Sequence, residues 1–191
     1  MSEKQRIIVG VSGASGVVMG YHLLKALGAH EDVERHLIVT GSARCTWTFE
    51  TDIPFEALTA CAEQVHDEFN FAASIASGSY DTAGMAVVPC SMKSLAGIVT
   101  GYADNLLLRA ADVCLKENRR VVLVPREAPF GKVHLRNLAA AADLGCTVIP
   151  PVLTFYNGLN TVDEQIDHLV GKILRQFGLK HEGFRPWAGA E

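Results

Sequence analysis

The segment RIIVGVSGASG, residues 6–16, joins a run of apolar residues to a turn made of small ones. The apolar run is too short for a helix and is typical of a buried strand, predicted over residues 6–11. A helix is predicted over residues 16–27, where Leu23 and Leu27 fall on one face. The chain therefore begins with a strand, a tight turn and a helix, the repeating unit of a parallel sheet.

The same alternation continues outward from this unit to the end of the chain. Further short apolar runs predict strands over residues 36–40, 85–89, 120–124 and 146–149. Stretches with helical periodicity predict helices over residues 41–50, 55–61, 92–99, 104–116, 135–144 and 161–177. This order favours an α/β fold, a single domain built on one doubly wound parallel sheet.

Length and composition are those of one globular domain. The chain has 191 residues, 49% apolar and 20% charged, with a formal net charge of −4. It carries no basic stripe for nucleic acid and no apolar run long enough to span a bilayer, so neither partner is expected. Five widely spaced cysteines predict a reduced, cytoplasmic protein. The histidines show no metal-ligand spacing, so no metal is expected.

The turn at residues 10–16 is suited to an anionic ligand. Its small residues let backbone N–H groups approach a phosphate or a flavin edge at a helix N-terminus. Ser12 occupies the second glycine position of a G-x-G-x-x-G motif, and no acidic residue ends the second strand, so NAD is disfavoured. A mononucleotide such as FMN fits better, and a tight turn without any ligand is the alternative.

Three further segments carry polar groups that suit the same chemistry. Residues 89–94 (PCSMKS) open a helix with two hydroxyls and an ammonium, and Arg126-Glu127 ends a strand with an anion clamp and a proton donor. Arg109 and Lys116 are seven residues apart on one helix face, where they form either a second phosphate site or a solvated face. An ordinary helix cap and a local ion pair are the alternatives for the first two.

Taken together, these motifs resemble the flavin prenyltransferase family of the UbiX type, which includes small subunits associated with hydroxyarylic acid decarboxylases. The matching segments are VSGASG (11–16), SGSY (77–80), PCSMKS (89–94), GYADN (101–105), RAADV (109–113), LKE (115–117) and VPRE (124–127). They occur in the family's order over nearly the whole chain.

The resemblance implies a flavodoxin-like, Rossmann-like fold that binds reduced FMN as a substrate. Dimethylallyl monophosphate would alkylate FMN at N5, and a second ring would close at C6 without a metal. The product, prenylated FMN, would serve a UbiD-type decarboxylase. A non-catalytic FMN carrier is the alternative function. The related flavin-dependent cysteine decarboxylases are disfavoured, because this chain lacks their asparagine after the third strand and their Pro-x-Met-Asn segment.

Site residues carry over from the family position by position. The implied flavin-binding residues are Gly13, Ala14, Ser15, Thr40, Ser91, Met92, Lys93, Ser94 and Arg126. The implied catalytic residues are Ser15 and Glu50, which manage the proton near N5, and Glu127, which exchanges a proton around the leaving phosphate. The implied prenyl-phosphate ligands are Arg109, Lys116, Tyr156 and Lys172, and Trp187 matches a lid aromatic.

The family also implies a homo-dodecamer. Residues 1–181 would form the FMN-binding domain, and residues 182–191 would be a tail that packs on a neighbouring subunit. Two stretches depart from the family pattern, residues 128–132 after Arg126-Glu127 and residues 152–154 before Phe155-Tyr156. Both lie beside the expected prenyl pocket, which leaves the donor open between a monophosphate and a diphosphate.

Overall fold

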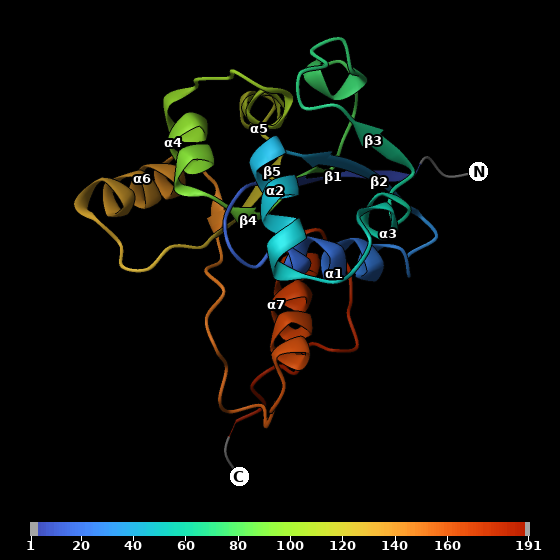
Figure 1. Ribbon diagram of the computed structural model, residues 1–191, viewed down its shortest axis with the longest axis vertical. Helices are drawn as coiled ribbons and strands as arrows, with labels where there is room; N and C mark the ends of the chain where they lie inside the picture. Colours follow the sequence, from blue (N-terminus) through green and yellow to red (C-terminus); the bar gives the residue numbers. More distant parts are fainter. Residues whose placement is uncertain (1–3, 190–191) are drawn as a thin grey trace.

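The computed structural model describes residues 4–189, which form one α/β domain around a six-stranded parallel sheet (Figure 1). The strand order is β3-β2-β1-β4-β5-β6, and every neighbouring pair is parallel. The strands are β1 (Gln5–Val11), β2 (Val33–Val39), β3 (Gln64–His66), β4 (Gly84–Cys90), β5 (Arg120–Pro125) and β6 (Thr147–Val148). The predicted doubly wound parallel sheet is confirmed.

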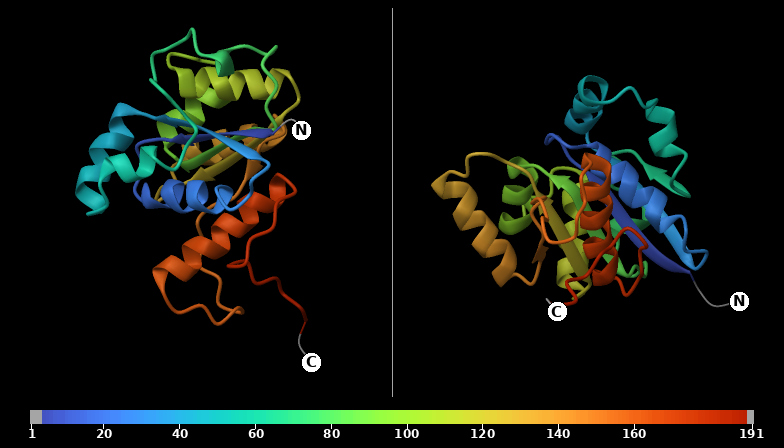
Figure 2. Two further views of the ribbon diagram at one scale, coloured as in Figure 1. Left: turned by 90° about the vertical axis from the view of Figure 1, so that its right-hand side faces the viewer. Right: turned by 90° about the horizontal axis from the view of Figure 1, so that it is seen from below.

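Helices cover both faces of the sheet (Figure 2). They are α1 (Val18–Leu27), α2 (Gly41–Glu50), α3 (Phe55–Thr59), α4 (Met92–Thr100), α5 (Leu106–Lys116), α6 (Lys132–Asp143) and α7 (Val162–Gln176), with a short 3₁₀ helix η1 (Ser74–Ala76). Helices α1, α2, α3 and α7 pack with one core cluster, and α4, α5 and α6 pack with the other. Alternate residues of β1 divide between the two clusters, with Ile7 and Val9 in the first and Ile8 in the second.

Strand β3 and the 3₁₀ helix were not predicted. Gln64 and Val65 are exposed, and the three residues of β3 carry no apolar pattern of their own. Their strand conformation comes from pairing with β2, where His66 lies opposite Ile38. The five predicted strands alone have the order of a flavodoxin-like sheet, and β3 extends it at the edge.

Two elements begin clearly earlier than predicted, β2 because of a tertiary contact and α6 because of a local one. Strand β2 begins at Val33, because residues 33–35 pair with the start of β1. Helix α6 begins at Lys132, where the His134 imidazole accepts the N–H of Gly131 at 3.1 Å. Helix α4 begins where the sequence places it, with Ser91 as its N-cap, and α7 begins at Val162, one residue later than predicted, because Thr161 is its N-cap.

The strand order reverses between β1 and β4, and Ser12 joins their carboxyl ends. Its Oγ donates to the carbonyl of Pro89 at 3.0 Å and accepts from the N–H of Ser91 at 2.8 Å. Its own backbone N–H also donates to the Pro89 carbonyl at 3.2 Å. Ser12 is almost completely buried. The turn after β1 and the N-terminus of α4 are therefore held side by side at the point where doubly wound sheets bind ligands.

We predict that Ser12→Ala lowers the free energy of unfolding by about 2 kcal/mol, because it removes a buried hydroxyl and leaves the half-buried N–H of Ser91 without its acceptor. Urea denaturation measures the change. Thr48→Ala is the matched control, since the Thr48 hydroxyl is exposed and bonds only within α2, to Cys45. Equal stabilities of the two variants would contradict a structural role for the Ser12 hydroxyl.

Candidate functional site

Four loops converge at the carboxyl edge of the sheet. Thr40 follows β2 and is tied to β1, because its backbone N–H donates to the carbonyl of Val11 at 3.0 Å. Its side chain caps α2 by accepting the N–H of Ala43 at 3.2 Å. Ser91 caps α4 in the same way, by accepting the N–H of Ser94 at 3.2 Å. Two helix N-termini thus open onto one crevice, which suits an anion.

Gly13 lies at the closest approach between the turn after β1 and α2. A Cβ atom at this position would overlap the side chain of Ser42. The Ser42 hydroxyl also lies 3.0 Å from that of Thr40. The predicted flavin residues Gly13 and Thr40 are therefore brought together through Ser42, a residue two positions after Thr40 that was not among the predicted site residues.

Glu50, the last residue of α2, accepts hydrogen bonds from the turn that follows β1. Its Oε2 accepts the N–H of Gly16 at 2.7 Å and the N–H of Val17 at 3.3 Å. The carboxylate therefore lies at the N-terminus of α1, next to Ser15, where a negative charge is favoured. A carboxylate has several acceptor positions, so Glu50 can hold the turn and still take up a proton. Glu50 thus contacts the residue that follows Ser15, and the shared role of the two residues in proton transfer stays a prediction.

A cavity of about 600 Å³ opens beside Ser15 and Gly16. Arg126 lines it with them, and the remaining wall is mostly apolar. That wall comes from α1, α7 and the loop before α7 (Val18, Met19, Pro151, Val152, Leu153, Phe155, Leu159, Val162, Ile166 and Leu169). The cavity thus places the Ser15 hydroxyl and the Arg126 cation at the crevice against a mostly apolar wall, to which Asn160, Thr161 and Gln165 add polar groups. This combination suits a ligand with an apolar and an anionic part.

The loop after β5 is hydrogen-bonded to β4 and carries an exposed carboxylate. The backbone N–H of Arg126 donates to the carbonyl of Cys90 at 3.2 Å, so this loop stays beside the helix cap at Ser91. Glu127 is exposed, and its carboxylate accepts the N–H of Ala128 at 3.0 Å. On α4, Met92 is half-buried, Lys93 exposed and Ser94 buried. The predicted flavin residues thus all lie along this one edge of the sheet.

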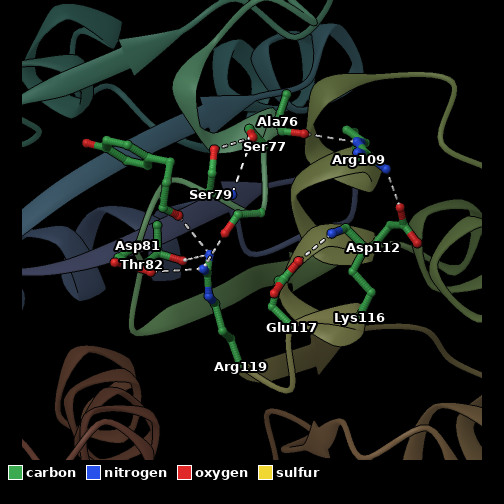
Figure 3. A network of polar contacts seen from close by, with 12 residues as sticks. Ala76, Ser77, Ser79, Asp81, Thr82, Arg109, Asp112, Lys116, Glu117 and Arg119 are labelled. Atoms are coloured by element: carbon green, nitrogen blue, oxygen red, sulfur yellow. Dashed lines mark hydrogen bonds and ion pairs between the residues drawn. The ribbon is translucent and has the colours of Figure 1, made fainter.

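The four predicted prenyl-phosphate residues do not come together within one chain. Arg109 and Lys116 lie on α5, on the face covered by α4, α5 and α6, and both are partly exposed. Arg109 pairs with Asp112 at 2.6 Å, and Lys116 pairs with Glu117 (Figure 3). Neither residue lines the 600 Å³ cavity. Tyr156 and Lys172 belong to the opposite side of the sheet, with α7.

Lys172 lines a second cavity of about 450 Å³ between α7 and β6. His168 also lines it, buried, with its Nδ1 accepting the backbone N–H of Arg185 at 3.3 Å. Burial lowers the pKa of the His168 imidazole, and the charge of Lys172 lowers it further. The His168 ring stacks on Phe184 with a centroid distance of 4.9 Å.

The first residues of the tail pack on the same chain's α7. Phe184 packs against Gly171 and His168, and the ring of Trp187 meets the edge of Tyr156 at 5.4 Å between centroids. Trp187 is largely exposed. Residues 190 and 191 lie outside the described part. Packing of this tail on a neighbouring subunit stays a prediction.

Comparison with known proteins identifies the family. The sequence profile described as Flavoprotein matches residues 1–178. The probable UbiX-like flavin prenyltransferase of Sedimentibacter hydroxybenzoicus is 59% identical over 186 residues, 97% of this chain and 98% of that protein. The chain belongs to the UbiX-like flavin prenyltransferases.

Solved structures of UbiX-like proteins share the fold. A dodecameric FMN-dependent UbiX-like decarboxylase from Escherichia coli O157:H7 superposes with a TM-score of 0.94 at 46% identity, covering 97% of this chain and all of that one. AnUbiX (PadA1), crystallised with FMN and dimethylallyl pyrophosphate, gives a TM-score of 0.95 at 42% identity, covering 99% of this chain and all of that one. The flavodoxin-like fold that the resemblance implied is confirmed.

Two further findings concern residues 4–189 of this UbiX-like chain. No cluster of three or more histidine, cysteine or acidic side chains within that range is arranged to hold a metal ion. None of the helices in that range combines the length and the apolar character needed to cross a membrane.

We predict that Glu50→Ala lowers the free energy of unfolding by about 1 kcal/mol, because the N–H groups of Gly16 and Val17 lose their acceptor. Glu50→Gln keeps an amide oxygen and should retain part of that stability. Urea denaturation measures both variants against Glu31→Ala, an exposed carboxylate outside the site. A Glu50→Ala variant as stable as Glu31→Ala would show that Glu50 does not hold the turn.

Proposed function

We propose that this protein transfers a dimethylallyl group from dimethylallyl monophosphate to N5 and C6 of reduced FMN. The product, prenylated FMN, would serve a UbiD-type decarboxylase. The observation that carries the proposal is the 600 Å³ cavity, in which Ser15 and Arg126 face a largely apolar wall at the crevice of the sheet. An isoprenoid chain fits such a wall, and a flavin fits the helix N-termini beside it.

The residues that line the crevice are suited to hold FMN. The N-termini of α2 and α4 offer N–H groups to a phosphate, and Thr40, Ser91 and Ser94 add hydroxyls. The absence of a side chain at Gly13 lets the turn after β1 lie directly on Ser42. Bound there, reduced FMN would supply a nucleophilic N5 and an electron-rich C6.

Transfer breaks the carbon–oxygen bond of the donor, and phosphate departs with the bonding electron pair. The freed carbon bonds to N5, which gives up a proton to Ser15 and Glu50 in our assignment. Ring closure adds one proton at the donor's double bond, joins its tertiary carbon to C6 and releases the C6 proton. We assign this second exchange to Glu127, which is exposed beside Arg126. The leaving phosphate needs cations rather than a metal.

We propose that those cations come from two subunits. The sheet separates Arg109 and Lys116 on α5 from Tyr156 and Lys172 on the other side, so the four residues of one chain cannot surround the same phosphate. A homo-dodecamer, as in the Escherichia coli relative, would bring the two halves together and would give the exposed Trp187 a surface to cover. We further propose that the protein works in the cytoplasm, which its five free cysteines support.

The alternative function is that of a non-catalytic FMN carrier for a hydroxyarylic acid decarboxylase. Such a carrier needs the crevice but has no use for an acidic residue beside Arg126 or for the cavity next to Ser15. The presence of both favours the transferase.

Anaerobic incubation of the protein with reduced FMN and dimethylallyl monophosphate tests the proposal. We predict that mass spectrometry finds the flavin heavier by one dimethylallyl unit, and that a parallel reaction with the diphosphate is slower. FMN that binds tightly but returns unchanged with both donors would favour the carrier. A faster reaction with the diphosphate would change only the donor.

We predict that Glu127→Gln lowers kcat by about 10²-fold or more, since general acid–base groups contribute at least this much. FMN binding, followed by flavin fluorescence, should stay as in the wild type because the amide keeps the side chain's shape. Glu56→Gln, an exposed carboxylate on α3, is the matched control and should keep its kcat. A wild-type rate in Glu127→Gln would remove Glu127 from the catalytic set.

A further inference from the structure

The segment Ser77-Gly78-Ser79-Tyr80, called here the SGSY loop, takes no part in the reaction steps proposed above. It links the 3₁₀ helix η1 to β4 and lies beside the two cations of α5 (Figure 3). The hydroxyls of Ser77 and Ser79 lie 2.8 Å apart. A Cβ atom at Gly78 would come within 2.7 Å of the Lys116 Nζ and would overlap the carboxylate of Glu117. The loop therefore rests directly on the C-terminal end of α5.

Arg119 holds this loop from the other side. Its guanidinium donates to the carbonyls of Gly78 at 2.7 Å and Tyr80 at 2.8 Å. It also reaches Asp81 at 3.2 Å and Thr82 at 3.5 Å. The Arg119 side chain is only 14% exposed. A largely buried guanidinium needs such partners, and its planar fork fixes two carbonyls at once in a way that a lysine cannot.

The end of α5 aims Arg119 at the loop. Asn118 adopts a left-handed conformation, with φ of 55°. The N–H of Arg119 then donates back to the carbonyl of Cys114 at 2.7 Å, a common way for a helix to end. The chain turns sharply there before β5 begins at Arg120, so the position of Arg119 follows from the same helix that carries Arg109 and Lys116.

Arg109 also contacts the chain next to the SGSY loop. Its Nε donates to the carbonyl of Ala76 at 3.1 Å, one residue before the SGSY loop. The loop thus lies between Arg119 on one side and Arg109 with Lys116 on the other (Figure 3). Two serine hydroxyls and two cations border one small surface, although the donors of Arg119 itself are directed to the carbonyls of Gly78 and Tyr80 and to the side chains of Asp81 and Thr82.

We propose that Arg119 is a positioning residue for the donor's phosphate. By fixing the carbonyls of Gly78 and Tyr80, it sets the SGSY loop against Arg109 and Lys116, so that the loop's hydroxyls and N–H groups join these cations in binding the anion. This inference rests on the proposed function, because the anion it concerns is the phosphate of the prenyl donor. Arg119 affects the phosphate only through the loop.

Arg119→Gln and Arg119→Lys test the proposal in the assembled protein. We expect the KM for dimethylallyl monophosphate to rise about tenfold in Arg119→Gln, since two hydrogen bonds to the loop are weakened. Arg119→Lys should recover part of this loss. The KM for FMN and the kcat at saturating donor should stay as in the wild type. Arg120→Gln is the matched control, with the same charge change at an exposed neighbouring residue.

Gly78→Ala tests the position of the loop at its contact with Lys116 and Glu117. Its methyl group would collide with Lys116 and Glu117, so the loop must move, and we expect the same donor-specific rise in KM. This variant and Arg119→Lys carry the test if Arg119→Gln does not fold. Donor binding like that of the wild type in all the variants that fold would overturn the proposal.

The failure of the proposed function is a separate result. A wild-type protein that produces no prenylated flavin would contradict the transferase, whereas an active wild type with an unchanged donor KM in Arg119→Gln would overturn only the role of Arg119. Calorimetric titration of dimethylallyl monophosphate into the FMN-loaded protein measures the same tenfold difference when there is no turnover.

Discussion

The hydroxyl of Ser12 connects the two strand ends on which the site is built. It bonds to both sides of the gap between β1 and β4, donating to Pro89 and accepting from Ser91. Since this gap is where the strand order reverses, the loops on either side turn in opposite directions and leave a crevice. Thr40, Gly13 and Arg126 reach that crevice only because their loops are each tied to β1, α2 or β4 by further short contacts.

The sheet itself limits what one chain can do. Its two faces carry separate cores, and α5 and α7 lie on opposite sides. Cations on these two helices cannot meet around one small phosphate within a single copy, however well each is placed. In the proposed function the crevice would hold the flavin and the cavity at Ser15 the isoprenoid chain, while the SGSY loop with Arg109 and Lys116 forms a separate cationic surface. Assembly of several copies is the natural way to combine them.

Local features of the sequence predicted much of this architecture. The hydroxyl caps at Ser91 and Thr161 mark helix starts because a cap needs only residues three positions away. By contrast, β3 is a strand because β2 lies beside it, and the side chain of Arg119 finds its carbonyl partners in a loop about forty residues earlier in the chain. Contacts of that range leave no local pattern. The motif resemblance named Glu50 and Ser15 as a pair, and the structure places the Glu50 carboxylate on the N–H of Gly16, the residue after Ser15.

The order of apolar runs and helical stretches was enough to determine the parallel α/β architecture, because strand and helix periodicities are local properties of the chain. The spacing of glycines and hydroxyls likewise predicted a ligand site at the carboxyl edge of the sheet. Which cations share a face, and which loop rests on them, was decided only by the tertiary structure. The family resemblance places Arg109 and Lys172 in one set, but they lie on opposite sides of a sheet whose packing depends on residues from the whole chain.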